Sequence, residues 1–385
     1  MSRAPCRPGP AHRNPVEGGA VRLDGPRGCA PEEVPAIVEL ANRVFERAGG
    51  EMGRKFPTLF CAGNAPWLRT FWDGGRPVAL VGVWCGEVVS SAGPLRVAHV
   101  GAVATVPEAR GRGLATALLE DAFARLYAAG TSLVFISGAR GLYLRLGARR
   151  FGRLWRYRWT GGLGPRPAPD VRAEAVQSLS PQDWGALRRL YAAEPVHYLR
   201  SAAGWRALLP AKGYLPAAAG RGLYLVRRAG TPAAYLLVGA ARSAEPGTAG
   251  VRCAVDEFAG EREAVVAALP QILEARGADA LDLLVQGGDE PLHALLRGHG
   301  LAPAPATYSG TVRLLHARAF LDVVTGVRPD LQRLGHAAPF DSAAGVAEAV
   351  ALTAASFGGE GEDTEPRPGG PVPLEVPRPD GLQFI

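Results

Sequence analysis

The stretch that most constrains how this 385-residue chain folds is residues 100–119, VGAVATVPEARGRGLATALL. Its first part is a run of small and β-branched residues that ends at Pro107 and predicts a strand. The loop ARGRG follows, and the leucines after it have the spacing of one helix face. The pattern therefore predicts a strand, a glycine loop and a helix in direct succession.

The glycine loop is suited to binding a pyrophosphate. Gly111 and Gly113 carry no side chains that would hold a ligand away from the backbone. Backbone amides at the N-terminus of the following helix lack partners within the helix, so they can point at phosphate oxygens. Arg110 and Arg112 add positive charge beside the same position. We therefore expect an anion site here.

Three phosphate-binding motifs compete for this loop. A P-loop needs a lysine and then a serine or threonine after its last glycine, and neither stands directly after Gly113. A dinucleotide fingerprint needs a third glycine where this chain has Thr116. The remaining pattern, R-x-x-G-x-A over Arg110–Ala115, resembles the acyl-CoA loop of the GNAT acetyltransferases, and the resemblance extends over strand, loop and helix. The alternative is a surface turn without a ligand in an arginine-rich chain.

The resemblance implies a fold, a co-substrate and a set of binding residues. GNAT proteins have an α/β (α+β) fold with a mixed central sheet flanked by helices, and we expect two such folds in tandem. In the family two neighbouring parallel strands separate, and the pantetheine arm of acetyl-CoA inserts between them. Acetyl-CoA is therefore the expected co-substrate, and no metal is expected. The matching positions of this chain are Val103, Thr105, Arg110, Gly111, Arg112, Gly113, Leu114, Ala115 and Thr116.

The length of the chain indicates two or three domains. We assign residues 1–19 to a loose tail, 20–160 to the catalytic GNAT domain, 161–170 to a linker, 171–315 to a second GNAT-like domain and 316–385 to a C-terminal extension with a docking tail. After the linker the order of elements repeats, and two predicted hairpins, DGGRPVALVG and RAGTPAAYLLVG, are alike. We expect Arg153–Thr160 to close the first sheet, and Ser180 to cap the helix that follows it.

The loop of the second domain differs from that of the first. Where the first domain has ARGRG, the second has AGEREA over Ala259–Ala264, with one glycine and two acids. Carboxylates at Glu261 and Glu263 would lie where a pyrophosphate binds and would repel it. We therefore expect that the second domain does not bind CoA and that it supports the first.

Tyr143 is the candidate general acid. The segment around it, SGARGLYLRLG, resembles the corresponding segment of the Eis-like GNAT enzymes, in which this tyrosine protonates the departing thiolate. A phenol is chemically able to do so. The alternative is an aromatic side chain that only fills the core.

Two candidates exist for the base that relieves the attacking amine of its proton. In Eis-like proteins the C-terminal carboxylate enters the active site, and the apolar ending GLQFI makes the carboxylate of Ile385 the first choice. The second candidate is His99, which occupies the position where many GNAT enzymes place a glutamate. An imidazole can act as a base near neutral pH, although a lone strand histidine can also be purely structural.

Composition excludes several other classes of protein. The net charge of +7 is spread thinly along the chain, which argues against nucleic-acid binding. Five widely spaced cysteines form no metal motif, and their odd number argues against a disulfide framework. The first residues lack the apolar core of a signal peptide, and no apolar run is long enough to cross a membrane. We therefore expect a cytoplasmic protein without a membrane partner.

Together these features predict an N-acetyltransferase that moves acetyl from acetyl-CoA to an amine by direct attack in a ternary complex. The acceptor is left open between small molecules, such as aminoglycosides or polyamines, and protein lysines or N-termini. Self-association into a homo-oligomer is also left open. The alternative function is a non-catalytic acyl-CoA-binding sensor or scaffold, which would keep the loop and lack turnover.

Overall fold

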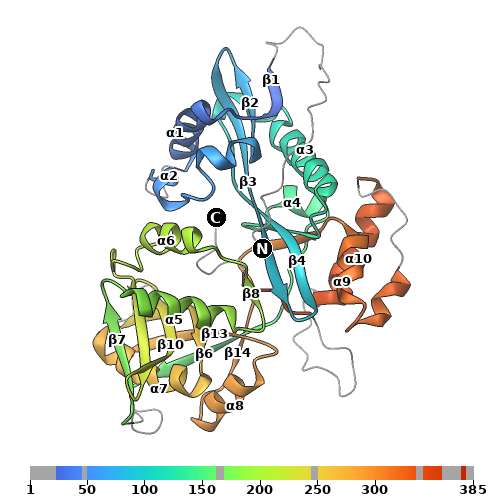
Figure 1. Ribbon diagram of the computed structural model, residues 1–385. Helices are drawn as coiled ribbons and strands as arrows, with labels where there is room; N and C mark the ends of the chain where they lie inside the picture. The colour runs from blue at the N-terminus through green and yellow to red at the C-terminus, as the bar shows by residue number, and fades with distance from the viewer. Residues whose placement is uncertain are drawn as a thin grey trace.

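Two mixed β-sheets, each covered by helices, make up the fold (Figure 1). The computed structural model describes residues 23–45, 50–161, 169–243, 250–334, 341–357 and 374–378. In Figure 1 the first sheet lies in the upper half, the second in the lower half, and the last two helices lie to one side. No helix within these described ranges is long and apolar enough to cross a membrane.

The first sheet carries the glycine loop. Its strands, in spatial order, are β1 (Asp24–Gly28), β2 (Leu68–Asp73), β3 (Arg76–Ser90), β4 (Gly93–Thr105), β5 (Leu133–Ile136) and β15 (Thr311–Leu314), and the short β8 (His197–Tyr198) pairs with β3. Its helices are α1 (Val34–Val44), α2 (Met52–Lys55), α3 (Leu114–Ala128) and α4 (Gly141–Arg145). The predicted strand, loop and helix are confirmed as β4, the turn after it and α3.

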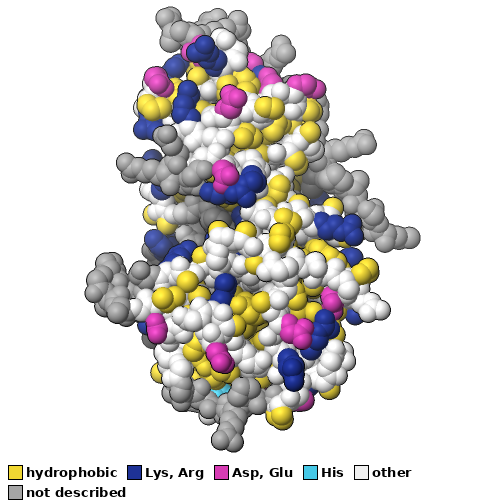
Figure 2. Space-filling model, turned by 90° about the vertical axis from the view of Figure 1, so that its left-hand side faces the viewer, with side chains coloured by type: hydrophobic (Ala, Val, Ile, Leu, Met, Phe, Trp, Pro, Cys, Tyr) yellow, Lys and Arg dark blue, Asp and Glu magenta, His cyan; other side chains and the backbone are white. Residues whose placement is uncertain are grey.

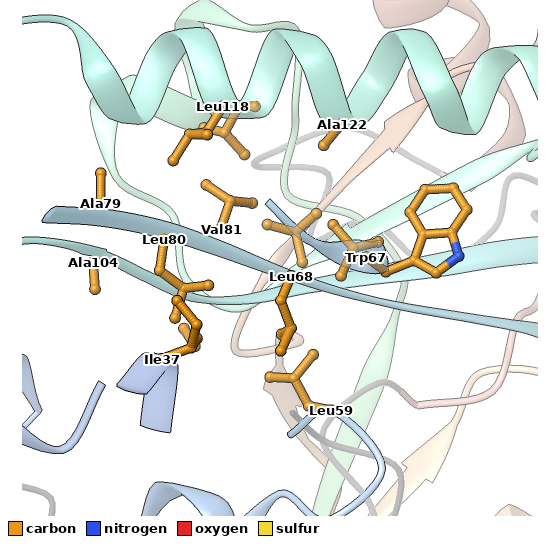
Figure 3. Close-up of a cluster of buried hydrophobic side chains, with 14 of the residues drawn as sticks. Ile37, Leu59, Trp67, Leu68, Ala79, Leu80, Val81, Ala104, Leu118 and Ala122 are labelled. Carbon is orange, nitrogen blue, oxygen red and sulfur yellow. The ribbon is translucent and has the colours of Figure 1, made fainter. Parts of the chain in front are cut away.

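Alternation along β3 explains how the first sheet is covered on both faces. Successive strand residues point to opposite faces, and Figure 3 shows Val81 pointing toward Leu118 of α3 while Leu80 points toward Ile37 of α1. All four side chains are fully buried. The sheet is therefore packed between α3 on one face and α1 on the other.

The second sheet has a similar order of elements. Its strands, in spatial order, are β14 (Ala304–Ala306), β6 (Leu154–Thr160), β13 (Ala280–Gln286), β12 (Val251–Gly260), β10 (Thr231–Val238), β9 (Gly222–Arg228) and β7 (Val171–Val176), and β11 (Arg242–Ser243) pairs with β12. Its helices are α5 (Pro181–Ala192), α6 (Ala202–Ala211), α7 (Arg262–Ala275) and α8 (Glu290–Gly298). The predicted cap of α5 is confirmed, because the Ser180 hydroxyl accepts from the Asp183 amide at 3.1 Å.

Both predicted hairpins are confirmed by the strand register. Asp73 pairs with Arg76 across the turn between β2 and β3. Arg228 pairs with Thr231 across the equivalent turn between β9 and β10. The two glycines of the first turn, Gly74 and Gly75, have φ of +52° and +81°, a region that glycine enters without strain.

The expectation that Arg153–Thr160 closes the first sheet is wrong. β6 instead pairs antiparallel with β13 over its whole length, and the Tyr157 hydroxyl lies 2.7 Å from Nδ1 of His293. The edge beside β5 is taken by β15, which the sequence assigned to the second domain. An alternating apolar strand fits either sheet, so its pattern does not specify the partner. The two halves of the chain have therefore exchanged one strand each.

The C-terminal extension packs on both halves. Helices α9 (Ala317–Val324) and α10 (Ala343–Phe357) contribute Phe320 and Phe357 to the buried cluster that also contains Phe151. Short 3₁₀ helices lie at Pro31–Glu33, Ala62–Trp67, Pro107–Ala109 and Pro329–Leu334.

The segment 374–378 joins the two sheets. The Glu375 amide donates to the Ser91 hydroxyl at 2.9 Å, at the turn between β3 and β4. Its carboxylate accepts from the Gly288 amide, and the Val376 carbonyl accepts from the Gln286 side chain at 2.7 Å, both just after or within β13. Residues 374–378 thus contact both sheets, whereas the apolar ending Leu382–Ile385, for which docking was expected, lies outside the described residues. The docking of that ending stays a prediction.

Surface charge is mixed on the face drawn in Figure 2, where basic and acidic side chains are interspersed over the described residues. Ion pairs also join neighbouring strands, as between Arg158 of β6 and Asp282 of β13 at 2.8 Å.

Replacement of Glu375 by glutamine tests how the docked segment is held. Burial raises the pKa of the Glu375 carboxyl, so ionising it costs more in the folded than in the unfolded chain. Glutamine keeps an oxygen for the Gly288 amide without a charge. Glu375→Gln should therefore unfold at a higher temperature than wild type at neutral pH, with the difference vanishing below about pH 4, where glutamate is protonated in both states.

Glu375→Ala is the matched comparison, because it removes the acceptor altogether. We expect it to lower the free energy of unfolding by about 1 kcal/mol. Thermal and denaturant unfolding between acidic and neutral pH measure both effects. A glutamine variant that is less stable than wild type at neutral pH would contradict the assignment.

Candidate functional site

A β-bulge interrupts β4 near its carboxyl end. Leu80 of β3 pairs with Ala104, and Gly82 pairs with Gly101, so Ala102 and Val103 together lie opposite the single residue Val81. Ala102 has φ of +50°, which is unusual for a residue other than glycine. A bulge leaves the extra residue unpaired and turns its backbone out of the ladder. The bulge therefore falls at Val103, where the sequence predicted a binding amide.

The strand next to β4 stops short of the bulge. β4 and β5 pair in parallel from Val97 with Leu133 to Val100 with Ile136. β4 continues to Thr105, and no strand of the described part of the chain pairs with that last stretch on the β5 side. The carboxyl ends of the two parallel strands therefore separate, which is where open α/β sheets bind ligands.

The loop after β4 is open and glycine-dependent. Gly111 and Gly113 have φ of +76° and +75°, and a Cβ atom at either position would meet nothing within 4 Å. Gly113 is the N-cap of the 15-residue helix α3, whose first turn has neither a side-chain cap nor an acidic residue. The first amides of α3, at Leu114, Ala115 and Thr116, are thus left to an external acceptor.

The two arginines of the loop have different surroundings. The Arg110 guanidinium donates to the Thr105 carbonyl at 3.2 Å, which ties the loop back to the end of β4. Arg112 is exposed and has no ion pair with the residues that the structure describes. Arg112 is therefore available to an anion at the N-terminus of α3.

Tyr143 lies at the same edge of the sheet. It is on α4, which follows the carboxyl end of β5, and its ring would be 3.9 Å from a Cβ atom placed on Gly138. The side chain is 4% exposed, and burial raises the pKa of its hydroxyl above the usual range despite nearby Arg140. Tyr143 therefore keeps its proton at neutral pH, as a proton donor must.

His99 lies in a closed aromatic environment. Its ring is 5.6 Å from Trp84, 5.1 Å from Phe135 and 5.4 Å from Tyr198, measured between ring centroids. Burial lowers its pKa to about 3, and Nε2 has no hydrogen-bond partner among the described residues. These surroundings favour packing over proton transfer.

The bulge in β4 lies between His99 and Val103, so the regular alternation of side chains does not continue from one to the other. The first-choice base, the carboxylate of Ile385, lies outside the described residues. Both assignments of the base stay predictions. Within the described chain, no three His, Cys, Asp or Glu side chains come together as a metal site.

The second sheet repeats the bulge and the separation of strands. Leu237 of β10 pairs with Glu257, and Val238 pairs with Val255, so Asp256 is the extra residue on β12. β12 and β13 pair in parallel only as far as Val255, although both continue beyond it. The second domain therefore has the backbone arrangement of the first.

The carboxylate that lies at the second loop is not one of those expected. Glu261 and Glu263 are both exposed, and Glu261 pairs with Arg228 at 2.7 Å. The carboxylate of Glu194 lies at the loop instead, bonded to Gly260 and Arg262. It precedes the loop by more than sixty residues, so no local motif could have revealed it.

Comparisons with known proteins agree with this geometry. Residues 26–151 match the family model for the acetyltransferase (GNAT) domain. A GCN5-related N-acetyltransferase from Anabaena variabilis has 14% identity and a TM-score of 0.60, over 78% of this chain and 75% of that one. A probable N-acyltransferase from Enterococcus faecalis has 16% identity and a TM-score of 0.60, over 78% and 74%. Eis1 from Mycobacterium abscessus has 16% identity and a TM-score of 0.48, over 66% of each chain.

A comparison with curated protein sequences finds no match. Residues 26–151 thus form a domain that matches the GNAT acetyltransferase family, and the solved structures above share the fold of the chain. A second domain with a similar order of strands and helices follows it.

A glutamate in place of Gly113 tests whether the loop is the anion site. Gly113→Glu adds a side chain and a negative charge at the N-terminus of α3, where the structure leaves open space. The positive φ costs only about 1–2 kcal/mol, so the fold should persist. We expect CoA binding, measured by calorimetry, to weaken at least about a hundredfold.

Gly74→Glu is the matched control. Gly74 also has a positive φ and open space around its Cβ position, but it lies in the hairpin between β2 and β3. It should bind CoA like wild type. Retained affinity in Gly113→Glu, or equal loss in both variants, would exclude the loop as the site.

Proposed function

We propose that the first domain is an N-acetyltransferase that moves acetyl from acetyl-CoA to a primary amine. The observation that carries the proposal is the convergence of three features at one edge of the sheet. These are the bulge at Ala102–Val103, the end of β4, which has no neighbouring strand on its β5 side, and the open loop at Gly111–Gly113. Each offers backbone amides to an elongated anionic ligand.

Different residues of this edge bind the pyrophosphate and the acyl end of acetyl-CoA. The amides of Gly111 to Thr116 and the Arg112 guanidinium hold the pyrophosphate, and Arg110 fixes the loop through the Thr105 carbonyl. The backbone at Val103 orients the acyl end and stabilises the negative charge that develops on the carbonyl oxygen. Acetyl-CoA supplies an activated acyl group, and the protein holds this group in position for attack by the amine.

Proton transfer involves two further groups. Tyr143 donates a proton to the departing thiolate, a role supported by its buried, protonated hydroxyl at the carboxyl end of β5. For the base we keep the carboxylate of Ile385 as first choice. His99 ranks second because its neutral ring, with a pKa of about 3, binds a proton weakly.

The acceptor belongs to the class of amines, in a small molecule or a protein. Release of free thiol from acetyl-CoA in the presence of an amine panel tests the proposal directly. The panel should include aminoglycosides, polyamines and lysine peptides. Tight binding of acetyl-CoA without turnover on any amine would favour a sensor or scaffold instead.

Tyr143→Phe tests the general acid. The phenylalanine fills the same buried space but has no proton to donate, so kcat should fall by about a hundredfold or more while CoA affinity stays unchanged. Tyr224→Phe is the control, because Tyr224 is a buried tyrosine of the second sheet. An unchanged kcat in Tyr143→Phe would remove Tyr143 from the mechanism.

Deletion of Leu382–Ile385 tests the terminal carboxylate. We expect turnover to fall about tenfold or more, because a general base is lost, and CoA affinity to stay as in wild type. His99→Phe, assayed in parallel, keeps an aromatic ring in the cluster of Trp84 and Phe135. Loss of turnover in His99→Phe, with none after the deletion, would reverse the order of the two candidates.

A further inference from the structure

The anion position of the second domain is filled by the chain itself. The Gly260 amide donates to Oε1 of Glu194 at 2.8 Å. The Arg262 guanidinium donates to both carboxylate oxygens of Glu194, at 2.9 and 2.6 Å. One backbone amide and a guanidinium at the start of α7 are the donors that bind a phosphate at a helix N-terminus.

Gly260 lets the loop pack closely on β10 and does not open the loop to a ligand. A Cβ atom on Gly260 would lie 2.3 Å from the Ala233 carbonyl oxygen of β10. At Gly111 and Gly113 of the first domain the same position is open. Gly260 therefore brings the loop against the neighbouring strand, which leaves Glu194 and Arg262 to occupy the space beyond it.

A small cleft lies beside Glu194 and Arg262. Its volume is about 90 Å³, and its walls include Glu194, Arg262, Gln286 and the docked residues Pro377 and Arg378. Ligand pockets usually measure about 300–1,000 Å³. The cleft between Glu194 and the C-terminal segment is thus smaller than a usual ligand pocket.

Glu194 is the first residue of a segment, residues 194–200, that runs from the second domain to the first sheet and back. In the middle of this segment, His197 pairs with Val89 of β3 and Tyr198 pairs with Val88. The Leu199 amide donates to the Glu87 carbonyl at 2.9 Å. The ring of Tyr198 also packs on His99. The middle of the segment is therefore part of the first domain.

The far end of the segment is held by a second ion pair. Arg200 bonds Glu257 of β12 at 3.0 Å, and their side chains are only 2% and 12% exposed. The Arg200 guanidinium also lies 4.3 Å from the centre of the Tyr191 ring and 4.1 Å from that of Trp205. Residues 194–200 are thus fixed to the second domain at both ends and to the first domain in between.

We propose that Glu194 is an internal substitute for a cofactor phosphate, and that the anion site it fills clamps residues 194–200 onto the first domain. The proposal does not rest on the proposed function, so it holds whether or not the first domain transfers acetyl. The second domain then has a mechanical role, because its loop at Gly260 and Arg262 holds residues 194–200 in place.

Hydrogen exchange with chemical rescue tests the clamp. In Glu194→Ala the Leu199 amide should exchange at least about tenfold faster, because a partly buried ion pair is lost. Millimolar inorganic pyrophosphate should restore protection by occupying the emptied position on Gly260 and Arg262. In wild type the same pyrophosphate should change nothing in residues 194–200.

Three further variants keep the test decisive. Glu261→Ala removes an exposed carboxylate beside the same loop and should exchange like wild type. Glu194→Ala combined with Arg262→Ala should exchange rapidly without rescue. If Glu194→Ala does not fold, Glu194→Gln keeps the shape, and its partial loss of protection should again be reversed by pyrophosphate.

Three results would overturn the proposal. The first is unchanged exchange at Leu199 in Glu194→Ala. The second is faster exchange that pyrophosphate does not reverse. The third is rescue that persists after Arg262 is removed, because the anion would then act elsewhere.

Discussion

The end of β4 is the constraint on which the first domain depends. Backbone amides and carbonyls need partners, and β4 has a strand beside it on the β5 side only as far as Val100. The bulge at Ala102–Val103 adds a further residue that the ladder does not accommodate. Packing of α1 and α3 on the two faces holds this unsatisfied edge in place. The proposed binding edge is thus a property of the sheet, and the side chains of Arg112 and Tyr143 lie beside it.

The two domains show how one backbone arrangement takes two roles. Both have a bulge and a pair of separating parallel strands. The first keeps its loop open with glycines that touch nothing, whereas the second closes its loop against β10 and satisfies it with Glu194. The difference lies in which donors remain without an internal acceptor. In the second loop the chain supplies the anion itself, so the Gly260 amide and the Arg262 guanidinium both have an internal acceptor.

Local features of this structure could be predicted from the sequence, and pairings between distant segments could not. The glycine loop, the hairpin turn at Gly74–Gly75 and the Ser180 cap have local signals, because each depends on a backbone angle or a nearby amide. The bulge was missed because its positive φ falls on Ala102 and not on a glycine. The partner of β6 was also missed, since an alternating strand fits any sheet. The open backbone of the loop at Gly111 and Gly113 could be predicted, and its role as a binding site stays a prediction, while Glu194 carried no local signal.

The exchange of β6 and β15 also bears on how the two halves are joined. If the halves were separate chains, each giving its last strand to the other's sheet, the assembly would be a domain-swapped dimer. In this protein both halves are on one polypeptide. The exchange of strands therefore needs no second molecule and does not depend on protein concentration. The relative orientation of the two sheets is then set by fourteen inter-strand pairs of β6 with its neighbours β13 and β14 and of β15 with β5.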